Sequence, residues 1–187
     1  MIKKVLFTAL IIGFLSFTSD NADGIIEFNY PKNKEAVLLM KTDQFENFEK
    51  EWRGEDYYYL CKGGKDNIIC SVLFYKLNKE EQKQMVDSFD PKGHTTSPII
   101  PFTYFLTGNL SKYEKNNDFW GEPTDDFMFK QNDITEFEGI KTKQKHMYAY
   151  GMFGKDLFIN VHLSKINYTS QDSITMRTIL MNLQKKK

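Results

Sequence analysis

The sequence lacks an excess of either charge and has no apolar run long enough to cross a bilayer. Its 25 basic and 25 acidic side chains give a formal net charge of zero. A chain without a basic face is not expected to bind nucleic acid, and the one basic cluster, Lys185 to Lys187, is typical of a solvated tail. The longest apolar run, Val5 to Phe17, is shorter than the ~20 residues that a membrane-spanning helix needs.

That apolar run belongs to a predicted secretion signal. It follows Lys3 and Lys4 and is succeeded by small and polar residues, which is the order that the export machinery reads. Cleavage after Thr18 or after Ala22 fits the sequence, so we assign residues 1–22 to the signal and leave its cleavage site open between 18 and 22. No cysteine ends the apolar run, which excludes lipid attachment to a new N-terminal cysteine.

We expect residues 23–187 to form a single globular domain, because about 165 residues are enough to bury one core. Loss of residues 1–18 removes two lysines and no acid, so the formal charge becomes 23 − 25 = −2. The signal and the abundance of Lys, Asn, Ile, Phe and Tyr indicate a bacterial protein that is periplasmic or secreted. We expect no stable membrane insertion after cleavage; an uncleaved anchor is the alternative.

The chain has only two cysteines, Cys61 and Cys70, and an oxidising compartment favours a disulfide between them. Two strand-prone segments, Tyr57 to Cys61 and Ile68 to Tyr75, flank a turn with two glycines, which predicts a hairpin. In a centred hairpin the two cysteines lie opposite each other, and in the non-hydrogen-bonded position their Cα atoms would be about 4.5 Å apart. A redox-active pair is the alternative, but its usual C-x-x-C spacing is absent.

Two capping-box spacings predict helices. The first helix is expected from Asp43 to Gly54, and its apolar residues recur at helical intervals: Phe45, Phe48 and Trp52. The second is expected to begin at Asn78, with an apolar side formed by Met85, Val86 and Phe89. Between His94 and Thr124 the periodicity is lost, which predicts a long loop region.

The last third of the chain predicts an antiparallel meander with one buried face. Its strands are expected at Phe127 to Phe129, Ile134 to Lys145, His146 to Phe153 and Asp156 to Lys165, after short strands near residues 24–30 and 35–40. Thr169 and Asp172 then cap a final helix. Its apolar stripe should cover the sheet and consists of Met176, Ile179, Leu180 and Leu183.

This order of elements, a long last strand followed by an acid-capped C-terminal helix, resembles the Mog1/PsbP-like fold. The resemblance is specific over Lys145 to Gln184 and carries no signature motif. It implies an α+β fold in which an antiparallel β-sheet is flanked by helices, as an α/β/α sandwich. It also implies an exported or accessory protein that binds partners and assists assembly. No site residue is carried over from it.

The sequence offers little for catalysis. No G-x-S-x-G motif is present, and His94 beside hydroxyl residues lies in a loop flanked by glycine and proline. His146 and His162 share a sheet face if the loop around Gly154 has an odd number of residues, and lie on opposite faces if it is only Gly154-Lys155. Zinc would need further ligands. We therefore predict no catalytic residue, no metal and no cofactor.

Aromatic residues make up 15% of the chain and are the strongest candidates for binding. The candidate binding residues are Tyr57, Tyr58, Tyr59, Phe119 and Trp120. Adjacent strand residues alternate in direction, so at least one tyrosine must face away from the other two. We predict a non-enzymatic binding or accessory module with a protein partner in the envelope or outside the cell. The alternatives are an envelope hydrolase acting on a glycan and an immunity-type inhibitor of an exported toxin.

Overall fold

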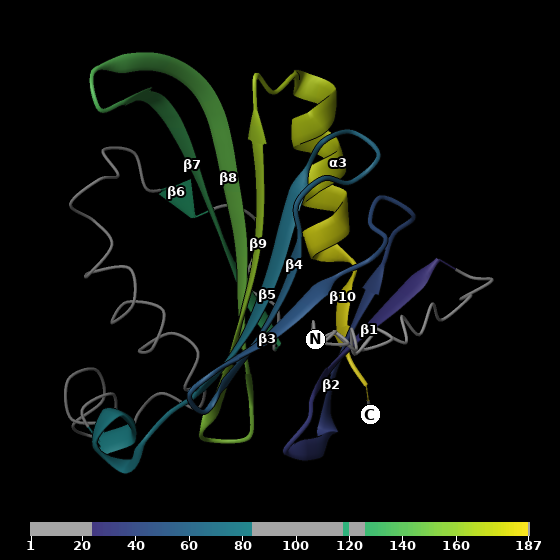
Figure 1. Ribbon diagram of the computed structural model, residues 1–187, viewed down its shortest axis with the longest axis vertical. Coiled ribbons are helices and arrows are strands. Elements are labelled where there is room, and N and C mark those ends of the chain that lie inside the picture. The colour runs from purple at the N-terminus through teal and green to yellow at the C-terminus, as the bar shows by residue number, and fades with distance from the viewer. Residues whose placement is uncertain (1–23, 84–117, 120–125, 187) are drawn as a thin grey trace, which may run out of the picture.

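The computed structural model describes residues 24–83, 118–119 and 126–186. This part of the chain forms two antiparallel sheets and one long helix, α3 (Ser170–Met181) (Figure 1). Residues 79–83 add a short helical segment.

The smaller sheet has the order β1-β2-β10, with β1 at Ile25–Tyr30, β2 at Asn33–Lys41 and β10 at Leu183–Lys185. The larger sheet has the order β3-β4-β5-β9-β8-β7-β6. Its strands are β3 (Glu49–Arg53), β4 (Asp56–Cys61), β5 (Ile69–Lys76), β6 (Asp118–Phe119), β7 (Phe127–Phe137), β8 (Ile140–Phe153) and β9 (Leu157–Ile166).

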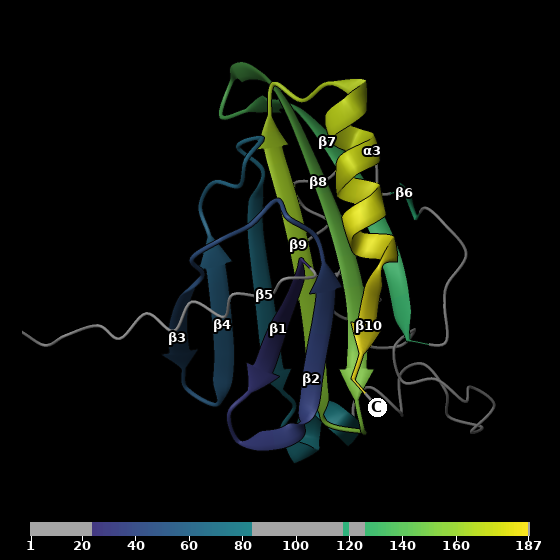
Figure 2. The same ribbon diagram turned by 90° about the vertical axis from the view of Figure 1, so that its right-hand side faces the viewer.

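The smaller sheet and α3 lie on the same side of the large sheet, which we call its inner side (Figure 2). The main core fills the space between these layers, and its fully buried members come from both of them and include Leu38, Met40, Val72, Phe74, Ala149, Ile159, Val161, Leu163, Met176 and Leu180. Burial of each large apolar side chain contributes about 1.5–3 kcal/mol, which makes this layer contact the main source of stability.

The outer face of the large sheet is also buried at its centre. A second cluster lies there and comprises Leu77, Met128, Tyr150, Met152 and Phe158. Polar side chains are buried beside it, and Lys130 is 1% exposed. The prediction of a meander with one buried face is therefore wrong for these strands.

The meander itself is present, but its boundaries differ from the prediction. Glu138 and Gly139 have positive φ angles of 48° and 79° and form the turn between β7 and β8. β8 then runs unbroken for 14 residues, where the sequence predicted a strand boundary between Lys145 and His146. A two-residue turn with positive φ joins antiparallel strands without splaying them, so Glu138-Gly139 sets the boundary.

The C-terminal helix confirms its predicted start. The Thr169 side chain accepts a hydrogen bond from the Asp172 backbone N–H, and the Asp172 carboxylate accepts one from the Thr169 backbone N–H, which completes the capping box. Met176, Ile179 and Leu180 are buried against the sheets, as predicted. Leu183 is also buried, but it belongs to β10.

The predicted α/β/α sandwich flanked by helices is wrong, because the described chain is mostly strand. The expected helix from Asp43 to Gly54 is also absent, and Glu49–Arg53 forms β3 instead. The sequence of this short segment is compatible with a strand as well as with a helix. Pairing with β4 decides between the two, since short segments depend on tertiary contacts more than on propensity.

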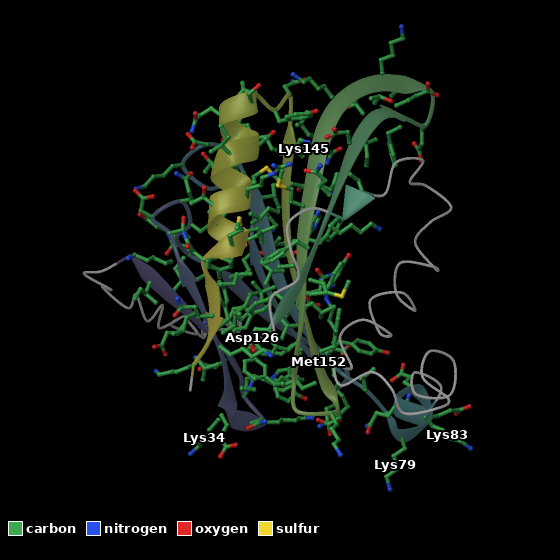
Figure 3. The ribbon with its side chains drawn as sticks, turned by 180° about the vertical axis from the view of Figure 1, so that it is seen from behind. Lys34, Lys79, Lys83, Asp126, Lys145 and Met152 are labelled. Atoms are coloured by element: carbon green, nitrogen blue, oxygen red, sulfur yellow. The ribbon has the colours of Figure 1, made fainter. Side chains whose placement is uncertain are left out.

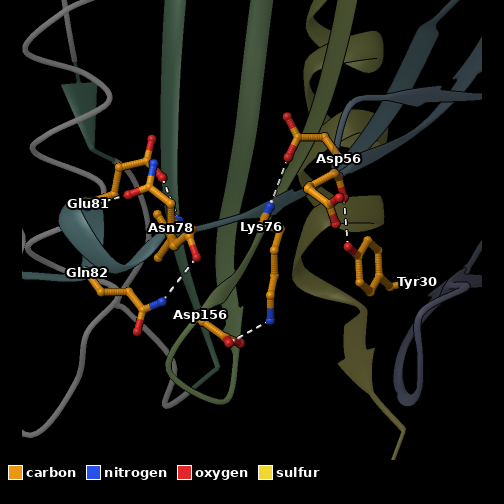
Figure 4. A network of polar contacts seen from close by, with 9 residues as sticks. Tyr30, Asp56, Lys76, Asn78, Glu81, Gln82 and Asp156 are labelled. Carbon is orange, nitrogen blue, oxygen red and sulfur yellow. Dashed lines mark hydrogen bonds and ion pairs between the residues drawn. The ribbon is translucent and has the colours of Figure 1, made fainter.

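Polar contacts hold the segment after β5 (Figure 4). Asn78 Oδ1 accepts hydrogen bonds from the backbone N–H groups of Glu80 and Glu81, and the Glu81 carboxylate accepts one from the Asn78 N–H, so the predicted helix start is confirmed. The predicted apolar side of this helix lies outside the described residues. Lys76 Nζ lies 2.6 Å from Asp156 Oδ2, which ties β5 to the β8–β9 turn.

Lysine side chains differ sharply in their surroundings (Figure 3). Lys34, Lys79 and Lys83 project from one end of the molecule, whereas Lys145 lies among other side chains. Lys145 Nζ pairs with Asp133 at 2.7 Å and lies over the Tyr168 ring. Within the described ranges, no helix has the length and apolar character that crossing a membrane requires.

Candidate functional site

β3 forms an exposed edge of the large sheet. It pairs with β4 and with no second strand among those described, and all five of its residues are exposed. A two-residue turn, Gly54-Glu55, joins it to β4, and Gly54 adopts a φ of 66° that favours glycine. The edge therefore offers backbone groups and side chains to a partner.

An aromatic and cationic surface, the Trp52 patch, lies at this edge and consists of Lys32, Lys50, Trp52 and Tyr57. Trp52 is 42% exposed, and its ring centroid lies 4.7 Å from that of Tyr57. Lys32 Nζ lies 4.9 Å from the Trp52 ring centroid. A hydrogen bond to Glu55 raises the pKa of Lys32, which favours its ammonium form. Such contacts hold an exposed indole in one orientation.

On the outer side of the same edge, Arg53 covers Tyr58. The Arg53 Cζ atom lies 4.1 Å from the Tyr58 ring centroid. Arg53 also donates two hydrogen bonds to Glu51 Oε2, from Nε at 3.1 Å and from a terminal nitrogen at 3.0 Å. β3 thus places tryptophan beside a tyrosine on its inner side and arginine beside a tyrosine on its outer side.

Two tyrosine hydroxyls join the β3–β4 hairpin to the smaller sheet. Tyr59 Oη accepts a hydrogen bond from the Asn29 N–H at 3.0 Å and donates one to the Asn29 carbonyl at 2.7 Å. Tyr30 Oη donates to the Glu55 carbonyl at 2.7 Å. Burial raises the pKa of Tyr59 to about 12, so the hydroxyl stays protonated. Tyr59 satisfies the backbone of β1 as a neighbouring strand would.

The predicted binding residues are placed far apart in the sheet. Tyr58 faces the side opposite Tyr57 and Tyr59, as the alternation required, and Tyr59 is only 4% exposed. Phe119 belongs to β6, at the opposite edge from β3, with four strands between β4 and β6. At about 4.8 Å per strand, the two segments do not adjoin within the sheet. Trp120 lies outside the described residues.

The two cysteines lie where the hairpin prediction places them. Cys61 and Cys70 are directly opposite partners in the β4–β5 ladder, and both are buried. Both are free thiols in the structure, so the disulfide stays a prediction. Complete burial raises the pKa of Cys70 well above its ordinary value, and such a thiol is poorly nucleophilic.

His146 and His162 converge on the outer face. β8 ends at Phe153 and β9 begins at Leu157, so the intervening turn has three residues, and the odd-length alternative is confirmed. His146 Nδ1 lies 2.8 Å from His162 Nε2, within hydrogen-bonding distance. Burial, with a smaller effect from His146, lowers the pKa of His162 to about 3. His162 is therefore neutral at physiological pH.

This histidine pair belongs to a row of rings across β8 and β9. The Tyr148 and His162 centroids lie 4.5 Å apart with nearly parallel planes, and Tyr150 continues the row 5.8 Å from Tyr148. Zinc usually takes four protein or water ligands. In the part of the chain that the structure describes, no third His, Cys, Asp or Glu joins the pair as a metal-ligand group.

Trp52 is the residue that sequence reasoning missed, because its spacing from Phe45 and Phe48 placed it on a helix. Glu49–Arg53 carries no apolar alternation of its own, because four of its five residues are charged. The two-residue Gly54-Glu55 segment before the tyrosine strand was the hairpin signal that could have found it.

Comparisons of this chain with protein-family models and with curated proteins give no match. The resemblance to the Mog1/PsbP-like fold therefore stays a prediction.

Proposed function

We propose that this chain is an exported, non-enzymatic binding protein that recognises a protein partner in the envelope or outside the cell through the Trp52 patch. The observation that carries the proposal is an indole exposed to 42% on an open sheet edge, with Tyr57 and Lys32 in contact with it. Tryptophan, tyrosine and arginine are the residues most enriched among interface hot spots.

Preorganisation supports the same proposal. Tyr59 and Tyr30 hold the hairpin against the smaller sheet through their hydroxyl groups. A side chain that is already fixed before binding loses little conformational entropy when a partner covers it. Most of the free energy gained when a partner covers the exposed ring of Trp52 is therefore available as binding affinity.

Affinity capture with matched variants tests the proposal. Residues 23–187 would be immobilised as wild type, as Trp52→Ala and as Phe137→Ala, and exposed to envelope extract and to culture fluid. Phe137 is 59% exposed and lies at the β7–β8 turn, so it controls for loss of any exposed ring. We expect quantitative mass spectrometry to find a stoichiometric protein that wild type and Phe137→Ala retain and Trp52→Ala loses. Equal capture by all three, or none by wild type, contradicts the proposal.

A further inference from the structure

We infer that the free edge of β3 pairs antiparallel with β3 of a second copy of this chain, about a two-fold axis through Glu51. The two large sheets then become one continuous sheet. The inference rests on the proposed function, because it names a second copy as a partner of the surface that contains Trp52.

The backbone of β3 determines which groups are available. A two-residue hairpin turn is flanked by a hydrogen-bonded pair, which here is Arg53 with Asp56. Alternation along an antiparallel strand then directs the backbone groups of Glu49 and Glu51 toward β4 as well. The N–H and C=O groups of Lys50 and Trp52 consequently point toward the free side of the edge.

Those groups select one register. Outward-pointing residues of one strand must meet outward-pointing residues of the other, which excludes any shift by a single residue. In one register, Lys50 of each copy pairs with Trp52 of the other. The N–H and C=O groups of Lys50 and Trp52, four in each copy, then all have hydrogen-bond partners. This register places Glu51 opposite Glu51 of the second copy, on the two-fold axis.

The side chains of β3 complement one another in this register. Glu49, which also pairs with Lys62 of its own chain at 3.0 Å, lies opposite Arg53 of the second copy at both ends, in the pairs whose side chains approach more closely. Lys50 lies opposite Trp52 of the second copy, and the Trp52 ring already accepts the Lys32 ammonium group at 4.9 Å. When the sequence Glu-Lys-Glu-Trp-Arg pairs with itself in this antiparallel register, four of its five residues therefore lie opposite a residue of complementary chemistry.

The exception is Glu51, where two carboxylates meet. Each Glu51 already accepts two hydrogen bonds from Arg53 of its own strand, and this guanidinium reduces the repulsion between them. Charged side chains on an edge strand normally prevent indiscriminate pairing. A strand with charges of both signs rejects unlike edges and accepts the one whose charges are complementary.

The short length of β3 sets the expected strength. A five-residue edge buries less than the ~1,200 Å² of a standard interface, so the dimer should be weak and reversible. Sedimentation velocity of residues 23–187 between about 10 μM and about 1 mM covers the range in which interfaces of this size associate.

Charge reversal makes the test specific. We expect wild type to dimerise with concentration, and Arg53→Glu, which sets like charges opposite each other twice, to reduce the association constant at least about tenfold. The double variant Glu49→Arg/Arg53→Glu should restore association, and Glu51→Gln should strengthen it by removing the central repulsion. Lys34→Glu, an exposed charge reversal on β2, should leave association unchanged.

Thermal unfolding of each variant confirms that it is folded before it is compared. A wild type that stays monomeric up to about 1 mM, or a folded double variant that stays monomeric while wild type dimerises, overturns the inference. If an unlike protein is still captured in a Trp52-dependent manner, the proposed function stands without the dimer. If neither association nor capture is observed, both are overturned.

Discussion

The two faces of the large sheet are both buried at its centre, but they are built differently. On the inner face, Ala149, Val161 and Leu163 meet other apolar groups. His162 lies between Val161 and Leu163 in β9, but its side chain is on the outer face, where it contacts Tyr148 and His146. The inner face depends on filled volume, whereas the outer face combines a smaller apolar cluster with hydrogen bonds that water can no longer supply.

Cavity formation on the inner face should have the largest effect. Leu163 is completely buried, so we expect Leu163→Ala to lower the free energy of unfolding by about 2–5 kcal/mol. Urea denaturation measures this loss. Ile166→Ala, at an exposed position near the end of the same strand, should cost less than about 0.5 kcal/mol. Equal losses for the two variants would mean that the inner face is not the main core.

Acid should weaken the outer face selectively. The pKa of His162 is about 3 in the folded protein, against 6.5 for the free side chain, so the unfolded chain binds more protons between these values. Stability is therefore full above about pH 6.5 and falls as the pH is lowered toward 3, by at most about 1.4 kcal/mol per pH unit from this group. Urea denaturation at several values between pH 5 and 7 measures the slope.

The variant His162→Gln removes the titration and retains a neutral polar side chain. We expect its stability to vary less with pH than that of wild type over the same range. If both proteins show the same slope, another group is responsible, and the neutral, buried state assigned to His162 is wrong.

Adjacent tyrosines allow a comparison of the faces at the hairpin. Tyr59→Phe on the inner side deprives the Asn29 N–H and C=O of their partner, and we expect a loss of about 1–3 kcal/mol. Hydrogen exchange at the Asn29 amide should accelerate in this variant. Tyr58→Phe on the outer side, whose ring remains under Arg53, is the matched control. A similar loss in both variants would disprove the role of the Tyr59 hydroxyl.

Trp52→Ala should have the smallest effect on stability. Its ring is 42% exposed and packs against Tyr57, Lys32 and Tyr30, so we expect a loss of less than about 1 kcal/mol in urea denaturation. The same variant should lose capture of the partner. A loss as large as that of Leu163→Ala would assign Trp52 to the core and leave no indole for binding.

Much of the local structure could be predicted because local signals determine it. The Thr169 capping box, the facing positions of Cys61 and Cys70, and the two alternatives for the histidines all follow from spacing. Which alternative held for the histidines could not be known, because one additional turn residue reverses the faces.

Other features depend on contacts that the sequence does not display. Residues 43–54 satisfied a helical spacing, but the five residues of β3 gained a ladder with β4. An alternating pattern in a strand also predicts one solvent-exposed face, so the burial of Lys130 and Phe158 on the outer side was not predicted. For the candidate site, the tyrosines of β4 were found, while Trp52 was assigned to the wrong element and Phe119 lies at the opposite edge.

The three-residue turn between β8 and β9 also constrains how this protein can change over generations. Deletion or insertion of a single residue between Gly154 and Asp156 would reverse the direction of every side chain in β9 relative to β8. Leu163 would then face the polar row, and His162 would enter the apolar core. Natural length variants of this turn should therefore differ by two residues at a time, even though the turn is exposed and contains a glycine.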